Sequence, residues 1–282
     1  MTVAGNVLLL ARGAQGSTVA TALRGGAAWC FVPWSCSTHH RTRLPVRPLR
    51  AHISTHKGLA PQKAKDILKK AQAVCFDVDS TVCAEEGIDV LAEFLGQGQA
   101  VADLTAKAMG GTVLFQDALQ GRLDLIKPSR AHFADCIAKH PATLSNGVKQ
   151  FIDILHKRGT AVYLVSGGFR LMIEPVADRL SIPHHRIYAN TVLFKEDGTY
   201  KGFDPQEPTS RDGGKPAVVK SLKERFGYVD VVMIGDGATD MQARPPADAF
   251  VGYGGVTVRE NVAKGADWFV YNFQELIDVV KS

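Results

Sequence analysis

Two pairs of aspartates in the chain have spacings that suit chemistry on a phosphate group. Asp77 and Asp79 stand two residues apart, and in extended backbone side chains at this spacing share a face, so both can address one ligand. One carboxylate can attack phosphorus to form an aspartyl-phosphate, while the second protonates the leaving alkoxide and then activates water. Asp236 and Asp240 bracket a glycine-containing turn, and their hard oxygen ligands suit Mg²⁺, which would offset the repulsion between nucleophile and phosphate. These four residues predict metal-assisted phosphoryl transfer.

Three further motif positions and one lysine could hold phosphate oxygens. Ser166 is followed by Gly167 and Gly168, which together offer a hydroxyl and glycine amides able to form an anion-binding nest. Lys215 follows a Gly-Gly pair and could neutralise charge on the transferring group. Each motif has a plainer alternative, since aspartates cap helices, Ser-Gly-Gly is a common turn, and a single lysine usually lies on the surface. The prediction of a site depends on their occurring together and in a fixed order.

Short apolar runs place these residues at the ends of expected strands. The runs 73–76, 161–165 and 231–234 end before Asp77, Ser166 and the Gly-Asp-Gly turn, respectively. Strands of a parallel sheet are buried on both faces and read as continuous apolar runs. Ligands bind outside the carboxyl ends of such strands. We therefore expect the aspartate pairs, the serine and the lysine to converge at one edge of a parallel sheet.

The rest of the chain alternates expected helices and strands, which indicates a doubly wound α/β fold. Residues 187–203 differ, because β-rich segments flank Glu196-Asp197-Gly198 as in a β-hairpin insertion. One helix is expected to begin at Asn146 as its N-cap and to end at Gly159. The other expected helices are 62–72, 169–180 and 216–226, and the other expected strands lie near 249–251 and 268–270.

A helical block separates the first two expected strands. Apolar residues recur at helical spacing from residue 85 to about residue 140, and Ser129 has the position and type of an N-cap within it. The block is too long for a simple crossover between neighbouring strands, so we expect a separate small helical cap inserted after the first strand. The predicted domains are therefore a phosphatase core, 62–84 plus 141–282, and a cap, 85–140.

Together these motifs resemble the haloacid dehalogenase superfamily of phosphohydrolases. The segments 76–89 (FDVDSTVCAEEGID) and 121–130 (GRLDLIKPSR) look specifically like the phosphoserine phosphatase family within it, and the resemblance covers roughly residues 62–282. It implies a haloacid dehalogenase-like core and an enzyme that uses Mg²⁺ to hydrolyse a small molecule, O-phospho-L-serine, to L-serine and phosphate through an aspartyl-phosphate. That reaction is the last step of serine biosynthesis by the phosphorylated route.

The resemblance also implies roles for individual residues. Asp77 would be the nucleophile and Asp79 the general acid/base, while Ser166 and Lys215 would hold phosphate oxygens. The implied Mg²⁺ site consists of the carboxylates of Asp77, Asp236 and Asp240, the last in a supporting position, and the backbone carbonyl of Asp79. The implied substrate-binding residues also include Glu86, Met109, Gly110, Arg122, Gly167, Gly168 and Thr239.

Within that set, Glu86 and Arg122 suit the amino-acid end of phosphoserine on chemical grounds as well. Phosphoserine carries an ammonium and a carboxylate besides its phosphate, so a site that selects it needs one anion and one cation. A guanidinium matches the planar carboxylate. The alternative is that both side chains lie on a solvated helix face, as is usual for charged residue types.

The basic character of the chain belongs to its N-terminal segment. The 282 residues have a formal net charge of +5, yet residues 1–50 hold six arginines and no acidic residue, and the remainder carries 27 basic and 28 acidic side chains. A composition rich in Arg and Ser and free of acids is typical of an organelle transit peptide, and a basic tail that touches nucleic acid is the alternative. We expect residues 1–54 to be a disordered transit peptide that is removed, with the chloroplast as destination and the mitochondrion as alternative.

Composition narrows the remaining function classes. No apolar stretch approaches the roughly 20 residues of a membrane span, and Cys75, Cys83 and Cys136 lack the spacing of a disulfide framework or a zinc site. We expect no membrane or nucleic-acid partner, and a monomer or homodimer. Three other functions stay as alternatives. The protein could transfer phosphate to another alcohol, it could act on another small phosphomonoester, or it could be a phosphate-binding module with an idle site. The second carboxylate, Asp79, speaks against the last, because binding phosphate needs no acid/base.

Overall fold

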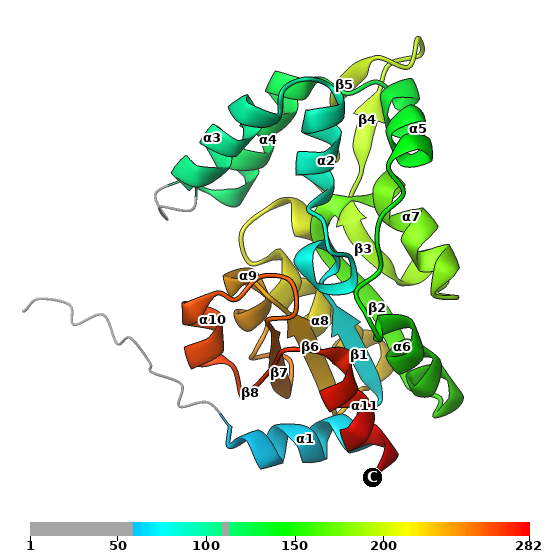
Figure 1. Cartoon of the computed structure of the whole chain (residues 1–282), viewed down its shortest axis with the longest axis vertical. Helices are drawn as coiled ribbons and strands as arrows, with labels where there is room; N and C mark the ends of the chain where they lie inside the picture. The colour runs from blue at the N-terminus through cyan, green and yellow to red at the C-terminus, as the bar shows by residue number, and fades with distance from the viewer. Residues whose placement is uncertain (1–58, 109–112) are drawn as a thin grey trace, which may run out of the picture. The chain divides into compact units, whose positions relative to one another are not determined.

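The structure, a computed structural model, describes residues 59–108 and 113–282 (Figure 1). The expected transit segment 1–54 and the candidate site residues Met109 and Gly110 lie outside these ranges. Among the residues that are described, no helix is both long and apolar enough to cross a membrane. The helices and strands, in chain order, are α1 (Pro61–Lys70), β1 (Ala73–Phe76), α2 (Gly87–Phe94), α3 (Gly98–Ala108), α4 (Phe115–Ile126), α5 (Arg130–Lys139), α6 (Val148–Lys157), β2 (Ala161–Phe169), α7 (Arg170–Arg179), β3 (Ile187–Asn190), β4 (Val192–Phe194), β5 (Tyr200–Phe203), α8 (Gly214–Phe226), β6 (Val231–Gly235), α9 (Ala238–Met241), β7 (Ala249–Tyr253), α10 (Glu260–Gly265), β8 (Trp268–Val270) and α11 (Phe273–Lys281).

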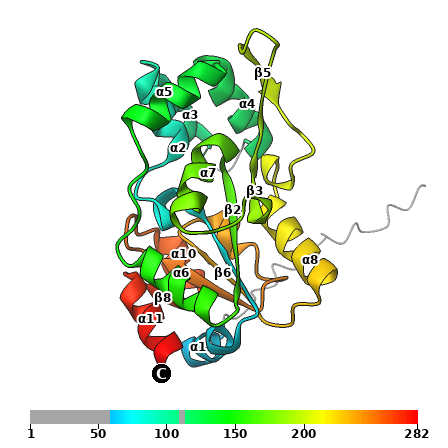
Figure 2. The same ribbon diagram turned by 90° about the vertical axis from the view of Figure 1, so that its right-hand side faces the viewer.

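Six parallel strands form one sheet in the order β3-β2-β1-β6-β7-β8 (Figure 1), which Figure 2 shows turned by 90°. In its centre, Phe76 of β1 lies opposite Leu164 of β2 on one side and Ile234 of β6 on the other. The chain fills one half of the sheet outward from β1 and then the other half outward from β6, so the strand order reverses between β1 and β6. Open α/β sheets bind ligands at such a switch point, and Asp77 directly follows β1 there.

Helices cover both faces of the sheet, because successive side chains of a strand point to opposite sides. Val74 and Phe76 of β1 pack into a cluster with α1, α6, α7 and α11, whereas Ala73 and Cys75 pack into a second cluster with α8 and α10. Burial of one large apolar side chain in such a core contributes about 1.5–3 kcal/mol. The prediction of a doubly wound α/β sheet is confirmed.

The four helices α2–α5, here called the helical insert, stand between β1 and β2 in the sequence (Figure 1). They share an apolar cluster that includes Leu91, Leu119 and Phe133 and extends to Phe169 at the end of β2. The antiparallel hairpin β4–β5 joins this cluster, with the Phe194 ring 6.1 Å from the Phe133 ring. The helical insertion after the first strand and the β-hairpin insertion agree with the sequence analysis, while the division into separate core and cap domains stays a prediction.

Of the two helix N-caps expected from the sequence, one is confirmed and one is wrong. Ser129 caps α5, since its hydroxyl accepts a hydrogen bond from the His132 backbone N–H at 3.1 Å. Asn146 does not cap α6, which starts at Val148 after Gly147. The backbone of Gly147 has φ +83°, a left-handed conformation that favours glycine over an ordinary capping residue.

Candidate active site

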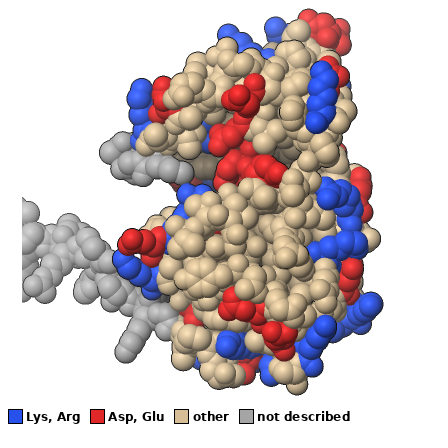
Figure 3. Space-filling model, viewed as in Figure 1, with Lys and Arg blue, Asp and Glu red and all other residues tan. Residues whose placement is uncertain are grey.

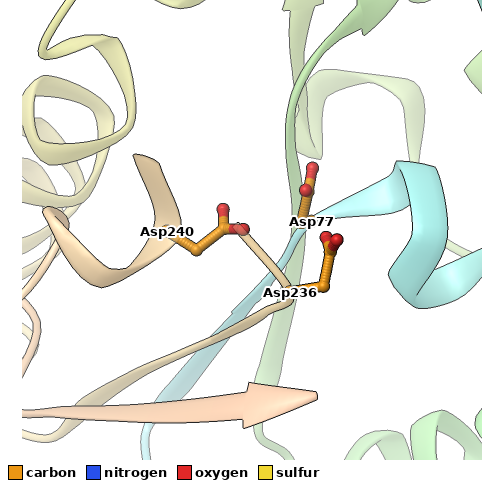
Figure 4. Close-up of side chains that lie close together, drawn as sticks. All are labelled: Asp77, Asp236 and Asp240. Carbon is orange, nitrogen blue, oxygen red and sulfur yellow. The ribbon is translucent and has the colours of Figure 1, made fainter. Parts of the chain in front are cut away.

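Three aspartates converge where β1 and β6 end side by side (Figure 4). The backbone N–H of Asp77 donates to the Ile234 carbonyl at 2.9 Å, which fixes Asp77 against the end of β6. Asp236 directly follows β6, and Asp240 lies one turn later in α9. One carboxylate oxygen from each of the three lies within 4.8 Å of the others, and all three residues are buried. The sequence-predicted metal ligands Asp77, Asp236 and Asp240 therefore form one cluster.

Lys215 lies against two of these carboxylates. Its Nζ is 2.8 Å from Oδ1 of Asp77 and 2.5 Å from Oδ1 of Asp240. Burial lowers the pKa of Lys215, but the Asp240 and Asp77 carboxylates more than offset this and raise it above its ordinary value, so the lysine stays protonated. The turn before Lys215 requires glycine, because a Cβ on Gly214 would overlap the Pro208 carbonyl oxygen. The Gly-Gly pair in the sequence therefore serves to bring the lysine into the site.

The Asp79 side chain is not part of this cluster of three and has a separate set of partners. One of its oxygens accepts a hydrogen bond from the Gly87 backbone N–H at 2.7 Å, and the other accepts one from the Ser166 hydroxyl at 3.0 Å. Burial, and then the charge of Asp77, raise the pKa of Asp79 to about 6. A carboxyl with a pKa near neutrality can both give and take a proton at physiological pH.

The segment Ser166–Gly168 differs from the sequence-based expectation. It was expected to form an anion-binding nest after the strand, but β2 continues to Phe169, and its pairing with β3 shifts register between Val165 and Phe169. Glycine is needed for close approach: a Cβ on Gly168 would lie 2.6 Å from Oδ2 of Asp79. The Gly168 N–H donates to the Ser166 hydroxyl oxygen at 2.8 Å and so orients this hydroxyl toward Asp79.

The candidate substrate residues are brought together only in part. Glu86 accepts a hydrogen bond from the Ser80 hydroxyl at 2.8 Å, and burial, followed by the charge of Asp79, raises its pKa to about 7. An added cation would favour the charged form of Glu86.

Arg122 of α4 is half-buried. Burial lowers its pKa, while the charges of Asp89 and Glu86 act in the opposite direction. In the described part of the chain it forms no ion pair within 4 Å. Thr239 is exposed on α9 beside the metal-ligand candidates.

Arg259 is a site residue that the sequence analysis missed. Its Nε lies 2.8 Å from Oδ2 of Asp236, and its Nη2 lies 3.7 Å from Oε1 of Glu86. It stands between β7 and α10, so it reaches the site from the same edge of the sheet as the other strand ends. It does not directly follow the end of β7 at Tyr253, as Asp77 follows β1 and Asp236 follows β6, so the strand-end pattern does not mark it in the sequence.

Carboxylates outnumber cations in this site, and Figure 3 shows acidic side chains gathered in the recess where the helical insert meets the rest of the described chain. Burial, and then the charge of Asp77, raise the pKa of Asp236 despite its contact with Arg259. Buried excess charge is strongly unfavourable unless it is compensated. A divalent cation that prefers hard oxygen ligands fits this donor set. The cluster of three aspartates can therefore hold a metal ion. The carboxylates of the whole site are those of Asp77, Asp79, Glu86, Asp236 and Asp240. All of these except Asp79 contact one of two cations, Lys215 and Arg259.

Comparisons with known proteins agree with this chemistry. A family model described as haloacid dehalogenase-like hydrolase matches residues 74–243. The chain is 47% identical over 244 residues to the chloroplastic phosphoserine phosphatase of Arabidopsis thaliana, and the alignment covers 83% of each chain. It is 48% identical over 217 residues to the phosphoserine phosphatase of Bos taurus, and that alignment covers 77% of this chain and 96% of the bovine one. Among solved structures, DsGPDH of Dunaliella salina matches with a TM-score of 0.68 and 32% identity over 77% of this chain and 37% of that chain, so there the same fold is part of a longer protein.

Proposed function

The chain belongs to the family of haloacid dehalogenase-like hydrolases, and we propose that it is a phosphoserine phosphatase that converts O-phospho-L-serine and water to L-serine and phosphate. The proposed reaction is the last step of serine biosynthesis by the phosphorylated route. The observation that carries it is the contrast between Asp77 and Asp79. Two carboxylates on one turn face different partners, as a two-step phosphoryl transfer requires, whereas a module that only binds phosphate needs no such pair.

Asp77 is the proposed nucleophile. Its buried carboxylate is held by Lys215 at 2.8 Å and by the Val78 N–H at 2.8 Å, so one oxygen is oriented while the other is available for attack. In the first step a bond forms between this oxygen and phosphorus while the bond from phosphorus to the serine oxygen breaks. Asp77, Asp236 and Asp240, with the Asp79 backbone carbonyl, would hold Mg²⁺, which supplies charge neutralisation at the phosphate when bound.

Asp79 is the proposed general acid and base. It gives its proton to the serine oxygen as that oxygen leaves, and it takes a proton from the water that attacks phosphorus in the second step, which releases phosphate and restores Asp77. The Gly87 N–H and the Ser166 hydroxyl orient the Asp79 carboxyl for both steps. Ser166 and Lys215 are the proposed holders of the remaining phosphate oxygens.

The amino-acid end of the substrate is assigned to the two charged residues that flank the phosphate site. Glu86 lies among other carboxylates and would gain a counter-charge from the substrate ammonium. Arg122 has no ion-pair partner in the described ranges and would bind the substrate carboxylate. Thr239, Gly167 and Gly168, together with Met109 and Gly110 outside the described ranges, complete the proposed contacts.

The experiment is a phosphate-release assay with purified protein. Phosphoserine should be hydrolysed with Mg²⁺ and not after the metal is removed with a chelator, and phosphothreonine and a sugar phosphate should be much poorer substrates. Equal rates on all three would contradict the proposed selectivity. Release of serine without free phosphate in the presence of a second alcohol would instead identify a phosphotransferase.

We also propose that the protein acts in the chloroplast. The support is the acid-free, arginine-containing composition of residues 1–50 and the similarity to a plant relative that is named as chloroplastic. A fusion of residues 1–55 to a fluorescent reporter should enter chloroplasts. Import into mitochondria would favour the alternative destination, and retention in the cytosol would contradict a transit peptide.

A further inference from the structure

The N-terminus of α4 takes its hydrogen-bond partner from a distant loop. The first N–H groups of a helix have no partner within the helix, and the residue before α4, Leu114, has no side chain that could supply one. Oδ2 of Asp212 accepts a hydrogen bond from the Phe115 N–H at 3.2 Å. In return, the Asp212 N–H donates to Oε1 of Gln116 at 3.4 Å. This reciprocal pair is built like a capping box, but its two halves are almost a hundred residues apart in the chain.

We infer that Asp212 is a positioning residue for substrate recognition, because it caps α4 from the loop that leads to Lys215 and so fixes α4 over the phosphate site. This inference rests on the proposed function. The pair of hydrogen bonds between Asp212, Phe115 and Gln116 is called the Asp212 clasp below. A carboxylate at a helix N-terminus is favoured by the helix dipole as well as by the N–H groups it accepts from.

The loop side of the clasp leads directly into the phosphate site. Gly213 next to Asp212 has φ +72°, and a Cβ on Gly214 would overlap the Pro208 carbonyl oxygen. Lys215, only three residues after Asp212, is buried between Asp77 and Asp240. Asp212 therefore presents its carboxylate from a fixed point of the phosphate site.

The helix side of the clasp carries residues that face the substrate region. The ring of Phe115 lies over β2 so closely that a Cβ on Gly167 would be 2.9 Å from it. Arg122 follows Phe115 by seven residues, which is about two helical turns, so both lie on the same side of α4. The position at which the first turn of α4 is held therefore also determines where the Arg122 guanidinium lies relative to the phosphate.

Asp212→Ala should loosen α4 without removing any group that touches the reacting atoms. Loss of a helix cap typically changes an equilibrium by about 2- to 30-fold, so KM for phosphoserine should rise by about that factor, with a smaller change in kcat. A generic aryl phosphate, which lacks the carboxylate, should be affected much less. The KM of Asp212→Asn should be close to that of the wild type, because an amide oxygen can still accept a hydrogen bond at a helix N-terminus.

Asp197→Ala is the matched control. Asp197 is also an exposed aspartate that accepts a hydrogen bond from a backbone N–H, that of Thr199 at 2.9 Å, but it does so within the β4–β5 hairpin. Its kinetics should match those of the wild type. The clasp is overturned if Asp212→Ala behaves like Asp197→Ala, or if both substrates are affected in parallel and Asp212→Asn is no better than Asp212→Ala.

Hydrogen–deuterium exchange separates failure of the clasp from failure of the proposed function. In Asp212→Ala the first turn of α4 should exchange faster than in the wild type, while α6 should not change. This readout needs no substrate, so it tests the clasp even if phosphoserine is not hydrolysed. Unchanged exchange in the first turn of α4 would contradict the clasp, whatever the protein hydrolyses.

Discussion

At the scale of single residues, the surroundings of a carboxylate decide what it can do. Asp77 and Asp79 are chemically identical and two residues apart, yet only Asp77 contacts Lys215 and shares the cluster with Asp236. Asp79 is instead surrounded by a backbone N–H and a hydroxyl, and burial raises its pKa to about 6. An anion held by a cation is suited to nucleophilic attack, and a carboxyl poised near neutrality is suited to proton transfer.

Asp79→Asn tests this division of roles. The amide oxygen can still accept the hydrogen bond from the Gly87 N–H, and the amide NH2 can donate to the Ser166 hydroxyl oxygen, so the fold of the turn should persist. The amide cannot, however, give or take a proton as a carboxyl does. We expect kcat to fall by about 10²–10⁴-fold, the usual contribution of a general acid or base. An activated aryl phosphate, whose leaving group needs no proton, should lose less in the first step, which a burst experiment can measure. A wild-type rate with phosphoserine would show that another group protonates the leaving oxygen.

The sequence predicted the site residues that follow apolar strands and missed those held by contacts between loops. Asp77 and Asp236 could be found because each stands directly after a buried run, and parallel strands bring such positions together. Arg259 and Asp212 could not be found in this way. Their partners, Asp236 and Phe115, lie 23 and 97 residues away in the chain, and neither contact leaves a periodic pattern in the sequence.

At the scale of elements, local sequence signals gave the type of each element more reliably than its end. All of the expected sheet strands are present, but β2 continues through Ser166, Gly167 and Gly168 to Phe169. Gly-Gly often ends a strand, yet here both glycines belong to β2, and glycine is required because Phe115 and Asp79 pack where larger side chains would be. Tertiary packing of this kind cannot be read from the segment itself.

Within the helical insert, α4 is the element that we expect to distinguish phosphoserine from other phosphate esters. Arg122→Ala should lower kcat/KM for phosphoserine at least tenfold, since losing one member of a desolvated charge pair costs about 2–5 kcal/mol. The rate with an aryl phosphate should fall far less. Arg130→Ala is the control, because Arg130 belongs to the same insert but its guanidinium lies over the Phe194 ring. A parallel loss with both substrates would mean that Arg122 serves folding or the phosphate, and not the substrate carboxylate.

At the scale of the whole molecule, charge is divided unevenly. Residues 1–50 are basic, while the buried site gathers more carboxylates than cations. Burial, with added repulsion from neighbouring carboxylates, raises the pKa of Asp79 to about 6 and of Glu86 to about 7. A carboxyl with a raised pKa in the folded state stabilises the fold below its unfolded pKa, near 4, and this stability is lost as pH rises through the folded pKa.

The metal-free protein should therefore lose stability from this site between about pH 5 and about pH 8, and Mg²⁺ should restore it. Deprotonated carboxylates bind the metal, so the increase in Tm caused by Mg²⁺ should grow as pH rises across this range. Differential scanning fluorimetry with Mg²⁺ or with a chelator measures this increase at each pH. Asp236→Asn, which removes one expected ligand, should flatten the dependence. An increase in Tm that is equal at both ends of the range would contradict the metal site.

The most direct test of the account is to find where phosphorus becomes attached during turnover. Protein mixed with phosphoserine and Mg²⁺ is quenched and treated with borohydride, which reduces an aspartyl-phosphate to homoserine, and peptides are then analysed by mass spectrometry. We expect homoserine at position 77, dependent on both phosphoserine and Mg²⁺, and none in Asp77→Asn. Hydrolysis of phosphoserine with no modification at position 77, or with modification at another aspartate, would contradict it.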